Sequence, residues 1–203
     1  MSTPRSGPGY LDPAEGRLLV ATPVIDEPTF FRTVVLLLEH DDAVGTLGVV
    51  LNRPTDLRVD EAVPGWQDEV CAPGVLFTGG PVAEGSALAL ATRRPVPGDE
   101  PDDTTREVPG LTGLFADLAI VDLAADSARL RPSVGDLRIY SGYAGWGPGQ
   151  LRGELRSGAW WVFESLPADW FSATPDRLWS EVLRRQGGRW RLWANAPDDP
   201  ETN

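Results

Sequence analysis

An amide and a guanidinium, Asn52 and Arg53, stand directly after the apolar run 47–51, at the point where the chain must leave a sheet. Functional side chains gather at such exits, which a rigid scaffold holds in position. The guanidinium supplies a fixed positive charge, and the amide both donates and accepts hydrogen bonds. These two residue types at a strand exit predict the binding of a polar or anionic ligand.

Two glycine-rich segments follow other apolar strands. Gly79 and Gly80 form a bend after residues 75–78 that glycine accommodates easily, either for packing or for close approach by a ligand. Residues 142–151 read Gly-Tyr-Ala-Gly-Trp-Gly-Pro-Gly-Gln-Leu, after a strand-like run at 137–140. The pattern predicts a strand, a shaped loop and then a helix, and free N–H groups at the start of that helix can bind an anion.

We expect the three segments to border one concave surface, with apolar walls from Tyr143 and Trp146. Such a cleft would accept a small anion, a nucleotide-like ligand or a peptide carboxylate. The architectural alternative stays open: Asn52 can stabilise a turn while Arg53 pairs with a carboxylate. The expected ligand-binding residues are Asn52, Arg53, Gly79, Gly80, Tyr143, Trp146, Gly147 and Gln150.

His40 is the single histidine and precedes Asp41 and Asp42 at the end of an apolar strand. Its ordinary pKa lies near neutrality, so it suits acid–base catalysis, and a hydrolase using His40 is the alternative function. Such an enzyme needs a nucleophile, for which the candidates are Ser141, Ser86, Thr78 and Cys71. The chain has no G-x-S-x-G elbow, and a hydroxyl or thiol within reach of His40 inside a pocket would favour the enzyme.

Missing residue types exclude several chemistries. The 18 basic residues are all arginine, so no lysine is present for a P-loop or a Schiff base. One histidine and one cysteine are too few for a closed zinc site, so we expect no metal, and no cofactor motif is present. Cys71 is expected to be reduced and unpaired, as is usual in a cytoplasmic protein.

The net charge of −12 opposes direct nucleic-acid binding, although Arg184, Arg185, Arg189 and Arg191 could form a small basic patch. We expect the partner to be a small molecule or a protein instead. The chain has no signal-like or membrane-spanning apolar run, which favours a cytoplasmic location away from membranes.

Apolar patterns and turn residues predict eight strands and two helices. The helix at 175–186 is the clearest, with Thr174 as its cap, Pro175 in its first turn and Gly187 at its end. The second helix is expected at 150–156. The predicted strands are 18–24, 33–39, 46–51, 75–78, 86–92, 118–123, 137–140 and 160–164.

Three motifs, Gly48-Val-Val-Leu-Asn-Arg-Pro54, Phe77-Thr-Gly-Gly-Pro-Val82 and the 142–151 stretch, resemble the YqgE/AlgH family in order and spacing. The resemblance implies a mixed α+β fold: a single domain with an irregular, partly barrel-like sheet surrounded by helices. It implies no activity beyond the label of a transcriptional regulator. Direct DNA binding would explain that label, but the negative net charge opposes such binding. We expect a leader at 1–15, the domain at 16–197, an exposed loop at 95–109 and an acidic tail at 198–203.

Overall fold

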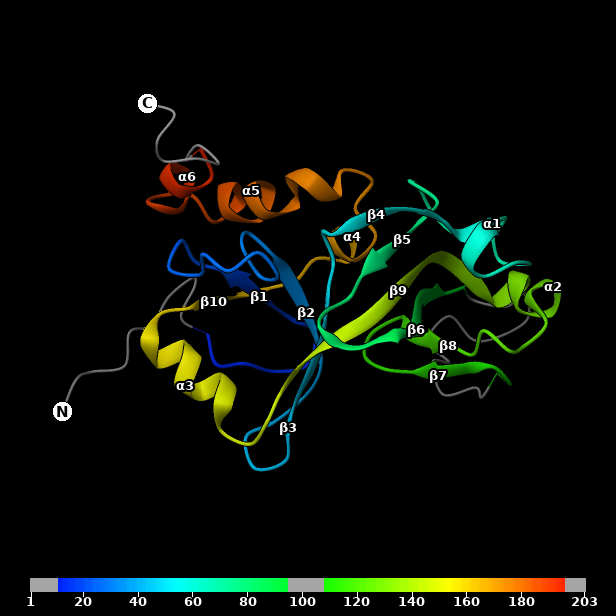
Figure 1. The fold of residues 1–203 in the computed structure, drawn as a ribbon, viewed down its shortest axis with the longest axis horizontal. Helices are drawn as coiled ribbons and strands as arrows, with labels where there is room; N and C mark the ends of the chain where they lie inside the picture. The colour runs from blue at the N-terminus through cyan, green and yellow to red at the C-terminus, as the bar shows by residue number, and fades with distance from the viewer. Residues whose placement is uncertain (1–10, 95–107, 196–203) are drawn as a thin grey trace.

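The apolar runs at the start of the chain are buried on both sides. Strand β1 (Arg17–Ala21) and strand β2 (Val34–Asp41) pair in the antiparallel direction, and most of their residues are buried. Successive side chains of a strand point to opposite faces, so these strands need cover on both. Leu18 contributes to a cluster with helix α5 (Pro175–Gln186), and Leu19 to a cluster with helix α3 (Gln150–Ser157). The two helices lie on opposite sides of the sheet (Figure 1).

The computed structural model describes residues 11–94 and 108–195. They form a single mixed α+β domain with a curled, largely antiparallel sheet in the order β10-β1-β2-β3-β9-β6-β8-β7, which confirms the expected fold class (Figure 1). Off this path, β4 pairs with β5, and β5 runs parallel to β9. The remaining strands are β3 (Gly45–Val50), β4 (Pro54–Arg58), β5 (Val75–Thr78), β6 (Val82–Arg93), β7 (Leu111–Gly113), β8 (Leu118–Val121), β9 (Val134–Trp146) and β10 (Trp160–Glu164).

Helix α5 has the predicted bounds. It begins at Pro175 and ends before Gly187, whose φ of 70° suits glycine. Thr174 stands at the N-cap position, but its side chain makes no capping hydrogen bond. Four short helices and a 3₁₀ turn complete the described elements: α1 (Val59–Ala62), α2 (Ser127–Leu130), η1 (Arg131–Ser133), α4 (Pro167–Trp170) and α6 (Trp190–Trp193).

The prediction of a long loop after residue 140 is wrong, because β9 continues to Trp146. Its first part pairs with β6 and β5, and its last part pairs with β3. The change of partner occurs at Gly142, which has a φ of 69° and where a Cβ would lie 2.6 Å from the carbonyl oxygen of Gly80. The glycines therefore let one strand cross between two parts of the sheet, and only residues 147–149 form the turn before α3.

The expected leader, loop and acidic tail lie largely outside the described residues, which omit 1–10, 95–107 and 196–203. Strands β4 and β7 were not predicted, and β6 begins four residues earlier than expected. None of the helices in the described ranges has the length and apolar character that crossing a membrane demands.

Candidate anion-binding site

Asn52 ties the end of β3 to the segment that leads into β2. Its Oδ1 accepts a hydrogen bond from the backbone N–H of Val34 at 2.8 Å, and its Nδ2 donates to the carbonyl oxygen of Arg32 at 2.9 Å. Asn52 is only 4% exposed, so these two bonds are made away from water. They hold Arg32 in a backbone conformation with a φ of 53°, which is uncommon for a residue other than glycine.

Arg53 continues this connection. Its Nη2 donates to the carbonyl oxygen of Phe31, and burial lowers the pKa of its guanidinium below the ordinary value for arginine. No carboxylate lies within ion-pair distance of Arg53 in the part of the chain that the structure describes, so the expected carboxylate pairing is absent there. Arginine is effectively always protonated in proteins, and Arg53 therefore keeps its positive charge.

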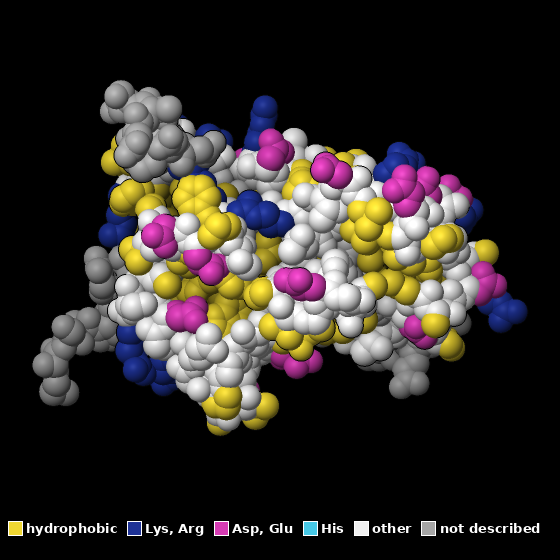
Figure 2. Space-filling model, in the orientation of Figure 1, with side chains coloured by type: hydrophobic (Ala, Val, Ile, Leu, Met, Phe, Trp, Pro, Cys, Tyr) yellow, Lys and Arg dark blue, Asp and Glu magenta, His cyan; other side chains and the backbone are white. Residues whose placement is uncertain are grey.

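Arg53 opens onto a concavity of about 740 Å³ between the exit of β3, the segment before β2, helix α5 and the two residues that follow α6. Among the described residues that line it, four are arginines and one is acidic. Acidic side chains are spread over the molecular face in Figure 2, as the net charge of −12 requires, so this excess of arginine is local. We call this concavity the arginine pocket, and its polar lining residues are Arg32, Asn52, Arg53, Asp176, Arg177, Ser180, Arg184 and Asn195.

Aromatic and neutral polar groups contact two of the arginines of this pocket. The guanidinium carbon of Arg32 lies 4.8 Å from the ring centre of Trp179, within the range of a cation–π contact. Arg184 donates to the Ser180 hydroxyl at 3.0 Å and to the Asn195 amide oxygen at 3.4 Å. Among the described residues, neither Arg177 nor Arg184 forms an ion pair. No carboxylate of the described residues therefore pairs with either charge.

The glycine bend lies elsewhere, against the backbone of β9. The N–H of Gly79 donates to the carbonyl oxygen of Ser141, and its own carbonyl oxygen accepts from the N–H of Val50, both at 2.8 Å. A Cβ on Gly79 would lie 2.2 Å from the carbonyl oxygen of Gly142, and one on Gly80 would lie 2.3 Å from the backbone of Tyr143. Both glycines thus allow two segments of backbone to cross, which is the packing role left open by the sequence.

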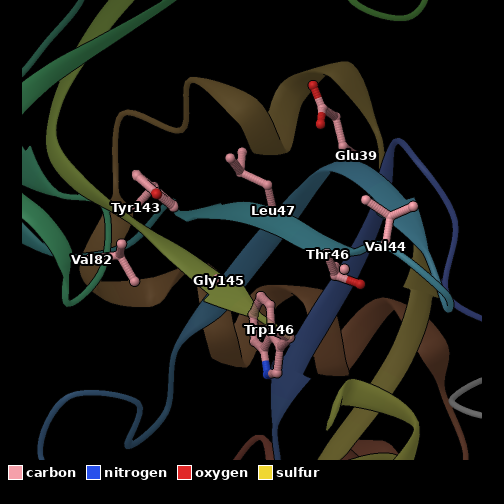
Figure 3. A pocket seen from close by; sticks show the side chains of 9 residues that line it. Glu39, Val44, Thr46, Leu47, Val82, Tyr143, Gly145 and Trp146 are labelled. Carbon is pink, nitrogen blue, oxygen red and sulfur yellow. The ribbon is translucent and has the colours of Figure 1, made fainter. Parts of the chain in front are cut away.

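Tyr143 and Trp146 line a separate, smaller groove of about 340 Å³ beside the hairpin of β2 and β3 (Figure 3). The Trp146 ring belongs to the cluster beneath α3, and its Nε1 donates to Glu154 at 2.9 Å. Gln150 accepts a hydrogen bond from the N–H of Gly147 and donates to Glu154. In the described residues, the structure does not bring Arg53 together with Tyr143 and Trp146 in one cleft, because β9 stays in the sheet to its end.

Arg32, Arg177, Arg184 and Asn195 were not among the expected site residues. Arg177 and Arg184 lie seven positions apart on α5, so both project from the same face two turns apart. That spacing is visible in the sequence. Their position over the exit of β3 is not, because it depends on how α5 packs against the sheet.

His40 makes a cross-strand contact at the end of the hairpin. Its Nδ1 lies 2.7 Å from Oγ1 of Thr46, its strand partner, and its Nε2 lies 3.8 Å from Asp42, whose carboxylate pairs with Arg152. Burial lowers the pKa of His40 below 6.5, although Asp41 opposes the shift. Thr46 lines the smaller groove but is only 7% exposed.

None of the four nucleophiles considered from the sequence is the partner of His40. Ser141 donates to the carbonyl oxygen of Glu84, and Cys71 is a free thiol beside Arg138. The contact of His40 with Thr46 is therefore the local hydrogen bond of a strand end, and it does not support the hydrolase alternative. In the described ranges, no group of three or more His, Cys, Asp and Glu side chains could hold a metal ion.

Related proteins and structures share this architecture. A UPF0301 protein of Streptomyces coelicolor is 50% identical over 98% of this chain and 100% of its own, and one of Thermobifida fusca is 42% identical over 93% and 94%. The crystal structure of protein DIP2367 from Corynebacterium diphtheriae is 32% identical, with a TM-score of 0.80 over 92% of this chain and 94% of that one. The solution structure of AlgH from Pseudomonas aeruginosa is 26% identical, with a TM-score of 0.65 over 91% and 94%. A family model described as AlgH-like matches residues 18–191, and the chain therefore belongs to the AlgH-like, UPF0301 family.

Proposed function

We propose that the protein is a binding domain whose arginine pocket takes a small anion with two or more negative charges. The observation that carries the proposal is the set of four arginines against one aspartate among the described residues around a single concavity, in a chain with a net charge of −12. Guanidinium groups bind phosphate and carboxylate through paired N–H donors, and such charge-assisted bonds are the strong ones.

The composition of the pocket favours a small anion over a nucleotide-like ligand. Two aromatic side chains, Phe31 and Trp179, are among the described lining residues, and the Arg32 guanidinium carbon lies 5.4 and 4.8 Å from their ring centres. Trp179 is only 4% exposed. A base therefore has no open aromatic face on which to stack at Trp179. The arginines project from separate elements, so an anion with several charged oxygens can contact more than one of them.

The same chemistry favours binding over catalysis. Guanidinium groups and amides dominate the polar lining, and they stabilise negative charge without removing protons. A regulatory role would follow if the ligand changed the affinity of the domain for another protein. Direct regulation by duplex DNA is disfavoured, because the net charge repels a polyanion. The single free cysteine supports a cytoplasmic location, which belongs to this proposal.

Isothermal titration with pyrophosphate and with inorganic phosphate, at low ionic strength, tests the proposal. We expect measurable binding of pyrophosphate and weaker binding of phosphate. Arg177→Ala removes an exposed charge of the pocket and should weaken pyrophosphate binding about tenfold or more, the value of one charge-assisted hydrogen bond.

Arg156→Ala is the matched control, because Arg156 is equally exposed but lies on α3, which does not line the pocket. It should leave the affinity within about twofold of wild type, once general charge effects are screened by salt. No binding of either anion, or an equal loss with both variants, would show that the pocket is not the site.

A further inference from the structure

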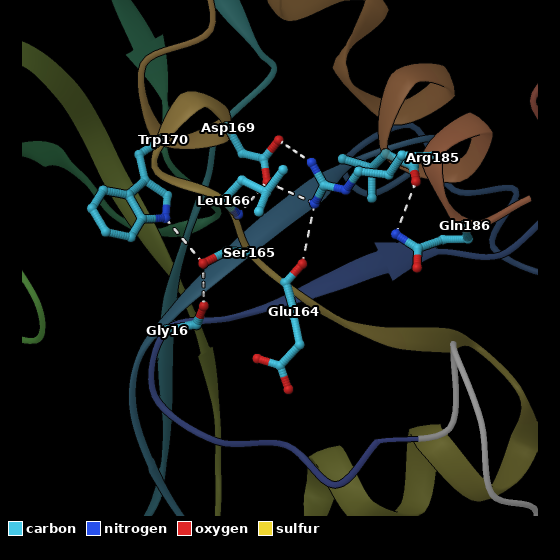
Figure 4. Close-up of polar contacts among 9 residues, drawn as sticks. Gly16, Glu164, Ser165, Leu166, Asp169, Trp170, Arg185 and Gln186 are labelled. Carbon is cyan, nitrogen blue, oxygen red and sulfur yellow. Dashed lines mark hydrogen bonds and ion pairs between the residues drawn. The ribbon is translucent and has the colours of Figure 1, made fainter.

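Among the described residues, two charged side chains are buried, Asp169 and Arg138, which are 5% and 2% exposed. Asp169 lies on α4 and is neutralised by Arg185 of α5, whose two terminal nitrogens lie 2.5 and 2.7 Å from its oxygens (Figure 4). The backbone N–H of Leu166 also donates to this carboxylate at 2.7 Å. Asp169 therefore has both a counter-charge and hydrogen bonds, which a buried ion requires.

Arg138 on β9 has no such counter-charge. Its Nη2 donates to the carbonyl oxygens of Ala72 and Ser172 at 3.0 and 2.9 Å, and the ring centre of Phe77 lies 4.2 Å from its guanidinium carbon. No carboxylate lies within ion-pair distance of it among the described residues. Its Nε and Nη1 are buried and have no hydrogen-bond partner within the protein.

The neighbours of Arg138 do not supply the missing negative charge. Tyr140 is two positions along β9, so both side chains are on the same face, and its buried hydroxyl also lacks a partner. The Cys71 sulfur lies 3.7 Å from Nη2. Burial raises the pKa of both the Tyr140 phenol and the Cys71 thiol, so both are neutral near pH 7. Asp136, on the same strand, is exposed and makes no ion pair with Arg138.

We propose that Arg138 and Tyr140 form a buried binding site for a small monovalent inorganic anion of the size of chloride. The three orphaned groups are all donors: the Nε–H and Nη1–H groups of Arg138 and the hydroxyl of Tyr140. Nε–H and Nη1–H lie on different edges of the planar guanidinium, so one anion accepts from the Tyr140 hydroxyl and from one of these edges. It also neutralises the guanidinium charge, which water does not. Cys71, next to Nη2 of Arg138, is half-buried. None of these residues lines the arginine pocket, so the two sites are independent.

Thermal and urea unfolding in sodium chloride and in sodium gluconate, at matched ionic strength, test this site in solution. Gluconate is too large to enter, so only chloride should stabilise the wild-type protein. Above its dissociation constant, each tenfold rise in free chloride should raise the folding equilibrium constant about tenfold. Equal stability in the two salts would overturn the proposal.

Two variants assign the effect to the site. Arg138→Met keeps an unbranched apolar side chain without the charge, and it should abolish the chloride dependence. Should that variant fail to fold, Tyr140→Phe removes only the orphaned hydroxyl and should weaken the dependence. Arg177→Ala, in the arginine pocket, should leave it unchanged. A chloride dependence that survives at full strength in both Tyr140→Phe and a folded Arg138→Met would contradict the assignment.

Crystals grown in sodium bromide provide the direct observation. The expected result is an anomalous difference peak within hydrogen-bond distance of Arg138 and the Tyr140 hydroxyl. Electron density without anomalous signal would indicate water. In that case the carbonyl oxygens and the Phe77 ring are sufficient to hold the charge, and the proposal is wrong.

Discussion

Replacing Asn52 by alanine tests the connection that shapes the arginine pocket. The side chain joins β3 to the segment before β2 through one bond from the Val34 N–H and one to the Arg32 carbonyl oxygen. Alanine removes both bonds while leaving the strands themselves intact. We therefore expect a loss of stability together with a loss of order at Arg32.

The magnitude follows from which groups are left without partners. Val34 is fully buried, so its N–H cannot turn to water, and an unsatisfied buried donor costs about 1–3 kcal/mol. The Arg32 carbonyl is only partly buried, so losing its hydrogen bond with Asn52 costs nearer the ordinary net value of about 0.5–1.5 kcal/mol for one hydrogen bond. The free energy of unfolding should fall by about 1.5–4.5 kcal/mol, a large share of the roughly 5–15 kcal/mol typical of a domain.

Urea unfolding followed by tryptophan fluorescence measures this change, and pyrophosphate titration of the folded variant measures the effect on the pocket. Asn195→Ala is the control, because Asn195 lines the same pocket but is exposed. It should change stability by less than about 0.5 kcal/mol. An Asn52→Ala variant as stable as Asn195→Ala would refute the argument, since the two buried bonds would then contribute nothing.

Three other outcomes are expected. In urea unfolding, Gly142→Ala should destabilise the domain by about 2–4 kcal/mol, because the φ of Gly142 is positive and the new Cβ meets a carbonyl oxygen. Gly153→Ala lies at an open position inside α3 and should instead stabilise the domain by about 0.5–1 kcal/mol. An NMR titration should give His40 a pKa below 6.5. The unfolded chain then binds the proton more readily than the folded domain, so this contribution to stability is complete above about pH 6.5 and is lost as the pH is lowered. His40→Gln should remove this pH dependence of the stability. A fluorescence titration with duplex DNA at about 0.15 M salt should give no sequence-specific, sub-micromolar binding. Such binding, if observed, would restore direct regulation of transcription as a function.

Local signals in the sequence were sufficient for several elements. The bounds of β5, β10 and α5 agree with prediction at both ends, because apolar periodicity and flanking glycine or proline act within a few residues. Strand β4 was missed because its residues are polar and largely exposed, so it carries no apolar pattern. Its strand conformation comes from pairing with β5.

The stretch around Gly142 shows the limit of such signals. Its glycines predict an irregular backbone, and the backbone at Gly142 does have a positive φ. A ligand loop and a strand crossing need the same small residues, however, so composition does not distinguish between them. The contacts with Gly80 and with β3 decide the matter, and both come from distant parts of the chain.

The sequence by itself determined the fold class, the family motifs and the presence of an amide and a guanidinium at the end of β3. Only the tertiary structure decided which other residues stand beside them. Arg177 and Arg184 reach Arg53 because the apolar face of α5 packs on the sheet through Leu178 and Val182, which directs the polar face of the helix toward the strand exit. Burial of apolar area drives that packing without direction, so the neighbours it creates can be read only from the folded chain.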